Sequence, residues 1–180
     1  MSSIFPKTIE LLDEARTPHL KEQFQITAKK DLLVLADRDQ SRWFPVFLKM
    51  QGVVQKILEV AEFEYIRHLV RQSECHKLVI EEGLIKMNPT IQFVELHYDQ
   101  PKLGRKTGLY CFYKKDSGFF EFQIGLYQAI IFDLLQEERK YSIQQLVEMA
   151  AMVKHFPVKS TDEWMMEVQQ MIQMGLLITA

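Results

Sequence analysis

The side chains best suited to binding a metal gather in one short stretch of the first half of the chain. Glu64 and His68 are four positions apart and would share one face of a helix, and Glu74, Cys75 and His76 follow them. Structural zinc sites show tighter paired spacing and four clear ligands. We therefore predict no metal site here, and we expect Cys75 to pack at the end of a helix.

A second group, Glu95, His97 and Tyr98, has the side chains of an acid–base pair. Alternate residues of a strand face the same side, so we expect a structural pair on one face of a strand and not an acid–base pair. The sequence contains no G-x-S-x-G elbow, no phosphate-binding glycine loop and no H-E-x-x-H pair. We predict a non-catalytic protein that carries no cofactor.

A third group combines cations with aromatic residues, a pattern that can bind phosphates or stacked bases. Its basic residues are Lys102, Arg105, Lys106, Lys114 and Lys115, and they are interleaved with Tyr110, Phe112 and Tyr113. Lysines also protect the edges of sheets from unwanted pairing, and the same residues could meet an acidic protein. Nucleic-acid binding through this segment is therefore an alternative function.

The bulk composition limits the function classes. The 180 residues carry a net charge of −2 with a pI near 6.2, which argues against a chain that wraps nucleic acid through bulk charge. The N-terminal residues do not read as a signal peptide, and no run of about 18 apolar residues predicts a membrane span. Two cysteines, Cys75 and Cys111, read as reduced packing residues. We expect a cytoplasmic protein, or a nuclear one if the source is eukaryotic.

Residues 1–75 are predicted to be a helical N-terminal part. Apolar residues recur at helical spacing in three places, which are Thr8–Ala15 after Pro6, a short segment after Pro18, and Ser41–Gln72. Gly52 would either break the last of these into two helices or mark a close approach of another part of the chain. The apolar patch Asp31–Ala36 fits a strand or a helix equally well.

Residues 76–122 are predicted to form a small antiparallel β region, because short segments rich in β-branched and aromatic residues alternate with turn residues. The clearest element is a hairpin of Thr107–Lys115 and Gly118–Gln123 around Asp116-Ser117-Gly118. Thr90–Tyr98 is a further predicted strand.

Residues 123–180 are predicted to be a winged-helix-like unit. Helices are expected at Leu126–Glu137, at Ile143–Met152 after the cap Ser142, and from a cap at Ser160 or Thr161 to Gly175. A closing strand would follow at residues 176–179. Three helices and a strand in this length are the winged-helix plan, with the second and third helices as the helix–turn–helix pair.

The charge of the third helix decides its predicted use. A DNA-reading helix needs Arg, Lys, Asn or Gln near its N-terminus, whereas this one begins Thr161-Asp162-Glu163-Trp164 and has no Lys or Arg before Gly175. From residue 116 to 180 there are nine acidic and four basic residues. The helix is therefore predicted to bind a protein, with one or two exposed methionines as adaptable contacts. The predicted partner-binding residues are Glu163, Trp164, Met165 and Val168.

Residues 93–180 also resemble the C-terminal region of cullins. The stretches that carry the resemblance are Phe93–Tyr98, Gly104-Arg105-Lys106, Leu126–Ile131 and Tyr141–Leu146. The resemblance implies an α/β part followed by a winged helix that is used for protein contact, and it implies a helix at residues 90–98. It does not extend to the segments that hold the RING subunit, so it does not imply ubiquitin-ligase scaffolding.

Together these observations predict an α+β protein that acts as a non-catalytic interaction or adaptor module. Its partner would be another protein or a second copy of itself, and no membrane partner is expected. The nucleic-acid-binding regulator that uses the basic hairpin at 102–115 remains the alternative. A third possibility is a regulatory domain that senses an apolar ligand between the long helix and the sheet.

Overall fold

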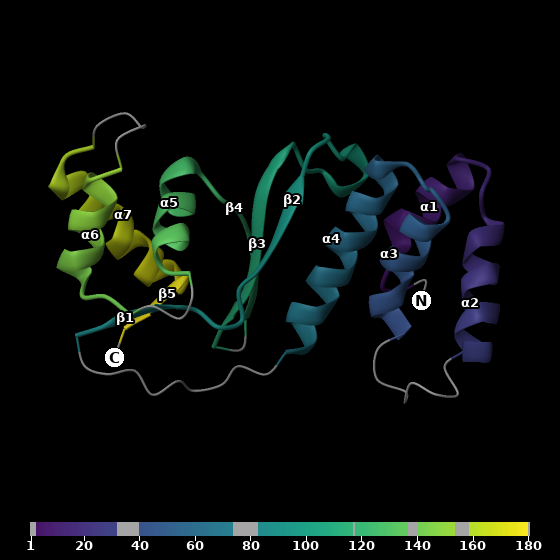
Figure 1. The fold of residues 1–180 in the computed structure, drawn as a ribbon, viewed down its shortest axis with the longest axis horizontal. Coiled ribbons are helices and arrows are strands. Elements are labelled where there is room, and N and C mark those ends of the chain that lie inside the picture. Colours follow the sequence, from purple (N-terminus) through teal and green to yellow (C-terminus); the bar gives the residue numbers. More distant parts are fainter. Residues whose placement is uncertain are drawn as a thin grey trace. The chain divides into compact units, whose positions relative to one another are not determined.

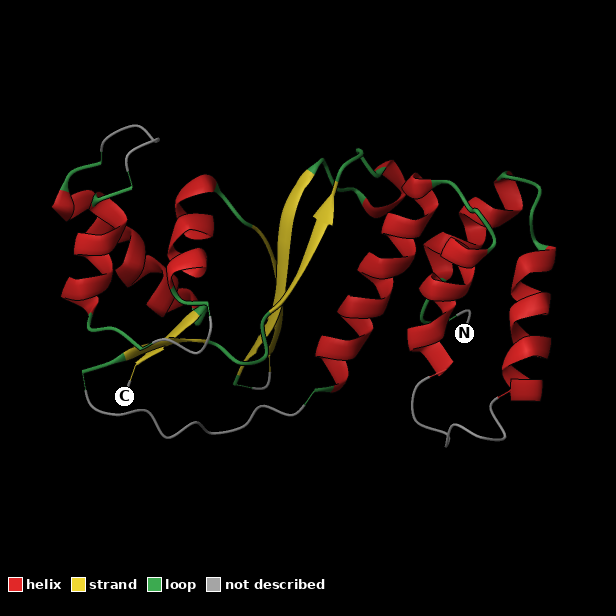
Figure 2. Cartoon of the chain, viewed as in Figure 1, coloured by secondary structure: helices red, strands yellow, loops and turns green. Residues whose placement is uncertain are grey.

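The computed structural model describes residues 3–31, 40–73, 83–116, 118–136, 140–153 and 159–179. Within these residues the chain is an α+β protein, as predicted, with helices and two small antiparallel sheets (Figure 2). Its internal contacts divide it into two units. Unit 1 comprises Met1–Gln72 and Val94–Gly108, and unit 2 comprises Ser73–Phe93 and Leu109–Ala180.

Four helices make up most of unit 1, namely α1 (Pro6–Glu14), α2 (His19–Asp31), α3 (Gln40–Met50) and α4 (Gln55–Gln72) (Figure 1). α4 packs against α1 and α3, and α2 packs against α3. The predicted break at Gly52 is confirmed, because this residue has a φ of 69° in the turn between α3 and α4. Glycine adopts this left-handed conformation without the strain that a Cβ would cause.

The core of unit 1 joins all four helices through aromatic and aliphatic side chains. Phe44 of α3 lies 4.9 Å from Phe5 and 5.1 Å from Phe24 of α2, measured between ring centroids. Leu12 of α1 and Leu58 of α4 are buried in the same cluster. Tilted and edge-on ring pairs add stabilisation beyond the area that they bury.

The segment 94–108 completes unit 1. It contains the last residues of β2 (Gln92–Leu96) and the short 3-10 helix η1 (Pro101–Leu103). Gly104 ends η1 with a φ of 65°, and Gln100 and Arg105 exchange backbone hydrogen bonds across this turn. The result is a tight loop that presents its side chains to α1 and α4.

Unit 2 contains a two-stranded sheet of β1 (Ile85–Met87) and β5 (Leu177–Thr179), which are antiparallel. The Ile85 N–H also donates to the carbonyl of Tyr141, so β1 has a chain segment on each side. The predicted closing strand at 176–179 is present, but its neighbour comes from before the helices in the sequence. This pairing separates β1 from the single β region that the sequence predicts.

The predicted hairpin is confirmed. β3 (Gly108–Lys115) and β4 (Gly118–Gln123) pair in register from Lys115↔Gly118 to Tyr110↔Gln123. The three-stranded sheet has the order β2-β3-β4. Asp116 begins the turn with a φ of 53°, a conformation that aspartate tolerates better than most residues.

Three helices, α5 (Leu126–Leu134), α6 (Ile143–Ala151) and α7 (Thr161–Met174), pack on one another in unit 2 (Figure 1). Their inner faces form an apolar cluster with β1 and β5. The predicted caps are confirmed: Ser142 and Ser160 accept hydrogen bonds from the N–H groups at the third position of α6 and α7, and Gly175 ends α7. These side-chain oxygens and the left-handed glycine satisfy backbone groups that a helix end leaves unpaired.

Residues 92–96 are a strand, as the residue pattern predicts, and not the helix that the cullin resemblance implies. The division into parts 1–75, 76–122 and 123–180 stays a prediction, and the two units cut across it because the chain returns to unit 1 at residue 94. Predictions for residues 32–36, for Glu74, Cys75 and His76, and for the break at 154–157 lie outside the described residues.

Candidate functional site

Helix α7 has one apolar face and one polar face. Trp164, Val168 and Met171 recur at four- and three-residue spacing and are buried, with Trp164 only 3% exposed. Met166 is on the opposite side and is 60% exposed. This spacing is that of a helix with a single inward stripe, so α7 offers its other side to solvent.

The predicted partner-binding residues therefore fall on different sides of α7. Trp164 and Val168 are in the core, where Tyr127 contacts the Trp164 ring edge-on, so neither side chain offers a surface to a partner. Met165 is half-buried against the same core. Glu163 is exposed and closes the N-terminus of α7, because its carboxylate accepts from the backbone N–H of Ser160 at 2.7 Å. Of the four predicted residues only Glu163 is therefore exposed, and a partner-binding role for α7 stays a prediction.

The exposed side of α7 is acidic and amide-rich. Its residues are Asp162, Glu163, Met166, Gln169, Gln170 and Gln173. Hydrogen bonds from Ser160 hold the pKa of the Glu163 carboxyl below its usual value, so this group is charged at neutral pH. Two carboxylates at the N-terminus and no cation on this side make a surface that the phosphate backbone of DNA would repel.

The cations nearest to α7 are already engaged. Lys159 forms an ion pair with Glu167 at 2.9 Å, and its ammonium lies 3.6 Å from the centroid of the Tyr127 ring. The ammonium of Lys115 donates to the carbonyl of Gln173 near the C-terminal end of α7, where the helix dipole favours a positive charge. These contacts hold both lysines at the ends of α7, and the helix itself contains no Lys or Arg.

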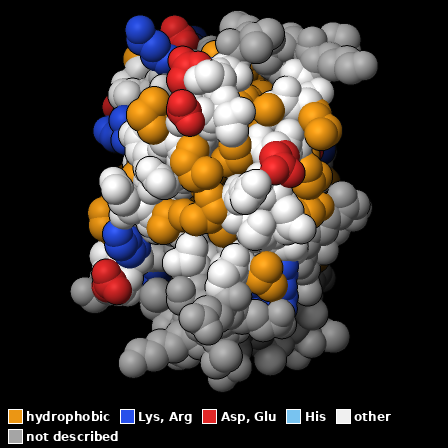
Figure 3. Space-filling model, turned by 90° about the vertical axis from the view of Figure 1, so that its left-hand side faces the viewer, with side chains coloured by type: hydrophobic (Ala, Val, Ile, Leu, Met, Phe, Trp, Pro, Cys, Tyr) orange, Lys and Arg blue, Asp and Glu red, His pale blue; other side chains and the backbone are white. Residues whose placement is uncertain are grey.

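Helix α6 adds to this surface. Its exposed residues include Gln144, Glu148 and, at its C-terminal end, Met152, which is 74% exposed. Figure 3 views the side of the molecule on which α6 and α7 lie, and it shows apolar side chains gathered across the middle with charged ones among and around them. Exposed methionines are flexible and polarisable, and they suit adaptable protein contacts.

The five basic residues of the predicted patch do not gather on one unit. Lys102, Arg105 and Lys106 belong to unit 1, whereas Lys114 and Lys115 belong to unit 2. Lys102 forms ion pairs with Glu10 and Glu14 of α1, both at 2.6 Å. Lys114 and Lys115 donate to the backbone carbonyls of Ser73 and Gln173. Most of the predicted patch therefore has structural partners within its own unit.

The pair of Glu95 and His97, which the sequence predicts to be structural, has a third member that sequence reasoning missed. Nδ1 of His97 lies 3.2 Å from a carboxylate oxygen of Glu59, a buried residue of α4, and Nε2 lies 3.6 Å from Glu95. The Glu59 carboxylate also accepts from the backbone N–H of Tyr98 and from the side chain of Gln100. A spacing of 38 residues gives no sequence signal for this pairing.

This Glu59–His97 network is best explained as a link between α4 and the returning segment. Gln100 also donates to the Lys56 carbonyl, so several bonds join the same two segments. Nearby, burial raises the pKa of the Glu62 carboxyl, an effect that Lys49 opposes. An orienting carboxylate on histidine is one part of a catalytic triad, but no serine, threonine or cysteine is among the recorded contacts of His97.

The metal prediction can be followed only in part. Glu64 is buried, and both oxygens of its carboxylate accept hydrogen bonds from Lys7 and Thr8 at the N-terminus of α1. In the described part of the chain, no three His, Cys, Asp or Glu residues form a group that could hold a metal ion. Cys111 is buried in β3, and burial raises the pKa of its thiol to about 12, so it packs as a small apolar residue.

Comparisons with known proteins leave the family open. No protein-family model matches the sequence, and no curated protein matches it. Among the described residues, no helix has the length and apolar character needed to cross a membrane.

Proposed function

We propose that this chain is a non-catalytic protein-binding module, and that the exposed sides of α6 and α7 form its docking surface. The observation that carries the proposal is the pairing of two highly exposed methionines, Met152 and Met166, with an acidic surround that contains no cation on α7. Such a surface fits a partner with apolar side chains set among basic ones.

The arrangement of the helices supports the further proposal that unit 2 is a winged-helix-like module. α6 and α7 pack together as a helical pair, α5 packs on both, and β5 follows α7. In such a module α7 would be the reading helix. Its carboxylates and amides favour protein docking over entry into a DNA groove.

The alternative, nucleic-acid binding by the basic hairpin, has less support. It needs a continuous cationic face, and the five cations belong to two units and have other contacts. If it holds, Arg105→Glu with Lys106→Glu should abolish binding to mixed oligonucleotides at low salt, and the affinity of the wild type should fall steeply with salt. We expect no measurable oligonucleotide binding by the wild type or by the Arg105→Glu, Lys106→Glu variant.

The direct test places a photo-crosslinking phenylalanine analogue, p-benzoyl-phenylalanine, at position 166 of the full chain in the cells from which the sequence comes. We expect a discrete protein adduct that disappears when Met152 is also changed to Asp. The matched control carries the analogue at Phe120, which is 43% exposed on β4 and already has a similar shape. Equal adduct patterns at positions 166 and 120, or none at 166, would reject the proposal.

A further inference from the structure

Helix α3 of unit 1 is apolar on two opposite sides. Phe44 and Leu48 are buried in the core, whereas Trp43, Val46 and Met50 are exposed by 43%, 43% and 79%. The three exposed residues follow the spacing i, i+3, i+7, which places them in one stripe about 10 Å long. A helix that is apolar on its solvent side as well as its core side has the pattern of a helix with a partner.

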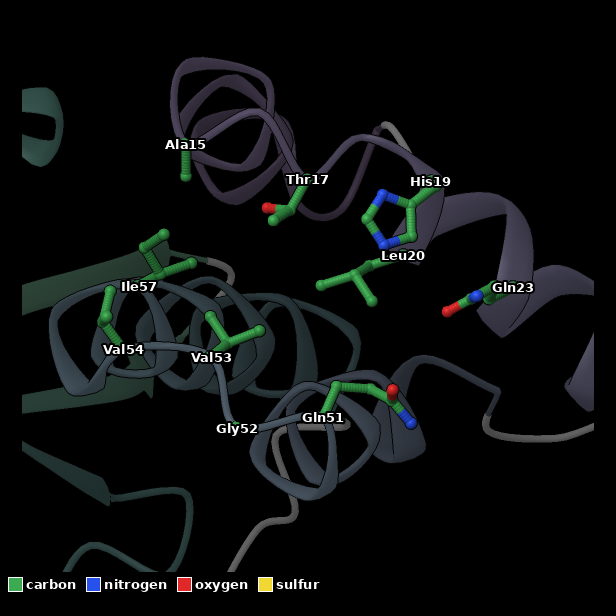
Figure 4. Close-up of a pocket in the computed structure, with 10 residues that line it drawn as sticks. All are labelled: Ala15, Thr17, His19, Leu20, Gln23, Gln51, Gly52, Val53, Val54 and Ile57. Atoms are coloured by element: carbon green, nitrogen blue, oxygen red, sulfur yellow. The ribbon is translucent and has the colours of Figure 1, made fainter.

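A pocket of about 400 Å³ lies beside the turn that follows α3. Gln51, the residue after Met50, lines it together with the turn residues Val53 and Val54 and with Leu20 and Gln23 of α2 (Figure 4). Its lining contains aliphatic, amide and hydroxyl groups and a single imidazole, and it contains no carboxylate or ammonium group. A pocket of this kind suits a large apolar side chain that projects from a partner.

The charged residues that α3 itself places beside the stripe have one sign, and the carboxylate of Glu62 in α4 acts on Lys49. Arg42 and Lys49 are both exposed and lie on one flank of it by their helical positions, and α3 contains no acidic residue. The Arg42 guanidinium also lies 6.0 Å from the centroid of the Trp43 ring. A partner that covers Trp43, Val46 and Met50 would therefore bring its own edge against two cations, and carboxylates are the groups that complement them.

We propose that the stripe of α3 binds an amphipathic helix of another protein, with acidic residues along one edge of its apolar face. Two turns of such a helix match the length of the stripe. This surface belongs to unit 1, so the proposal does not rest on docking through α6 and α7. With both surfaces, the chain would join a partner that has acidic edges to one that has basic edges.

The test uses the full chain and two designed peptides of about five helical turns (about 18 residues). Both have the same leucine-rich face, and the charged edge is glutamate in one and lysine in the other. Binding is followed by protection of tryptophan fluorescence from acrylamide, because Trp43 is exposed and the second tryptophan, Trp164, is buried. We expect the glutamate peptide to bind about ten-fold more tightly, since each exposed charge pair changes affinity about two-fold in either direction.

Two variants sharpen this experiment. Arg42→Glu with Lys49→Glu should invert the preference between the two peptides while leaving the apolar stripe in place. Trp43→Ala should weaken binding of the glutamate peptide about 30-fold, as expected for a central tryptophan, and is followed by displacement of a labelled peptide. Leu69→Ala is the control, because Leu69 is a partly exposed apolar residue of α4 outside the stripe and its loss should leave affinity within about two-fold.

Three results would overturn the proposal. Absence of binding by the glutamate peptide to the wild-type chain, shown to be folded by circular dichroism, rejects it outright. Protection of Trp43 by vesicles of phosphatidylcholine and phosphatidylglycerol at about 3:1, with no peptide binding, assigns the stripe to a membrane surface instead. Concentration-dependent dimerisation that protects Trp43 without peptide assigns it to a second copy of the chain.

Discussion

Within each of the two units, distant segments are joined by buried polar side chains, and the kind of side chain differs between the units. In unit 1 the buried charged groups are carboxylates of α4: Glu64 accepts three hydrogen bonds from Lys7 and Thr8 at the start of α1, and Glu59 accepts from the returning segment. In the described part of unit 2 the buried polar side chains, Asn88 and Thr90, are neutral, and the Asn88 amide donates to the carbonyls of Lys114 and Gly175. Both units therefore join distant segments through buried polar side chains, and these include charged carboxylates in unit 1 and are neutral in unit 2.

The exposed apolar surfaces of the two units differ in the charge of the residues around them. The exposed apolar residues of α3 in unit 1 lie beside two cations, and those of α6 and α7 in unit 2 lie among carboxylates and amides. A chain with two surfaces of opposite charge can select two unlike partners, because charge complementarity discriminates between partners more than it adds affinity. The predictions below test the difference in construction first.

The largest expected effect contrasts the two sides of α7. Trp164→Ala should lower the free energy of unfolding by about 3–5 kcal/mol, because it leaves a cavity in the core of unit 2. Met166→Ala should change it by less than about 0.5 kcal/mol. Urea unfolding followed by circular dichroism measures both, and a large cost at Met166 would mean that α7 is turned differently.

Next in size is the loss of the buried carboxylate of unit 1. Glu64→Ala should cost about 3 kcal/mol, because it leaves the N–H groups of Lys7 and Thr8 and the Thr8 hydroxyl buried without an acceptor. Glu64→Gln keeps one acceptor oxygen and should cost about half as much. Hydrogen exchange of α1 amides should rise with each loss in stability, and unchanged exchange in Glu64→Ala would contradict the proposed anchoring of α1.

A smaller effect is expected at a local cap of unit 2. Ser160→Ala removes the hydroxyl that accepts from the N–H of Glu163, and it should cost about 1 kcal/mol. The loss should be confined to unit 2, so hydrogen exchange in α1 should not change. Faster exchange in both units would show that the two unfold together and would weaken the comparison.

Local features of this kind are what the sequence predicts best. Ser142, Ser160, Gly175 and Gly52 act on their immediate neighbours, so their effects follow from residue type and position alone. The hairpin turn at Asp116 is likewise local.

The features that sequence reasoning missed are long-range. β1 pairs with β5 from about ninety positions away, as Ile85↔Thr179 shows, and Glu64 reaches Thr8 across 56 positions. No pattern of residue types encodes such pairings. The inward position of Trp164 and Val168 does follow from the sequence, because both share the spacing of an inward stripe with Met171.

The smallest expected effect is pH-dependent. The pKa of the Glu10 carboxyl is lowered from 4.5 and that of Lys102 is raised from 10.5, in each case chiefly by their mutual hydrogen bond. The ion pair of Glu10 and Lys102 therefore stabilises the folded state fully between pH 4.5 and pH 10.5. This stabilisation is lost as the pH falls through the lowered pKa of Glu10 or rises through the raised pKa of Lys102. Lys102→Met should be slightly less stable than the wild type at pH 7, and the difference should vanish in acid below the folded pKa of Glu10.

Urea titrations of both proteins across this pH range measure the effect. The control is Lys86→Met, a substitution of a lysine on β1 in unit 2. A difference between Lys102→Met and the wild type that persists in strong acid would mean that Lys102 acts through packing and not through its charge.

The most direct test of the protein-docking account needs no substitution in either surface. Mild hydrogen peroxide oxidises exposed methionines to the sulfoxide, and mass spectrometry follows each residue separately. In the purified chain, Met152 and Met166 should oxidise quickly and the buried Met171 slowly. In the native cell, with rates normalised to a methionine in a flexible tag, the account predicts several-fold slower oxidation of Met152 and Met166. Equal normalised rates in the cell and in the purified chain would contradict it.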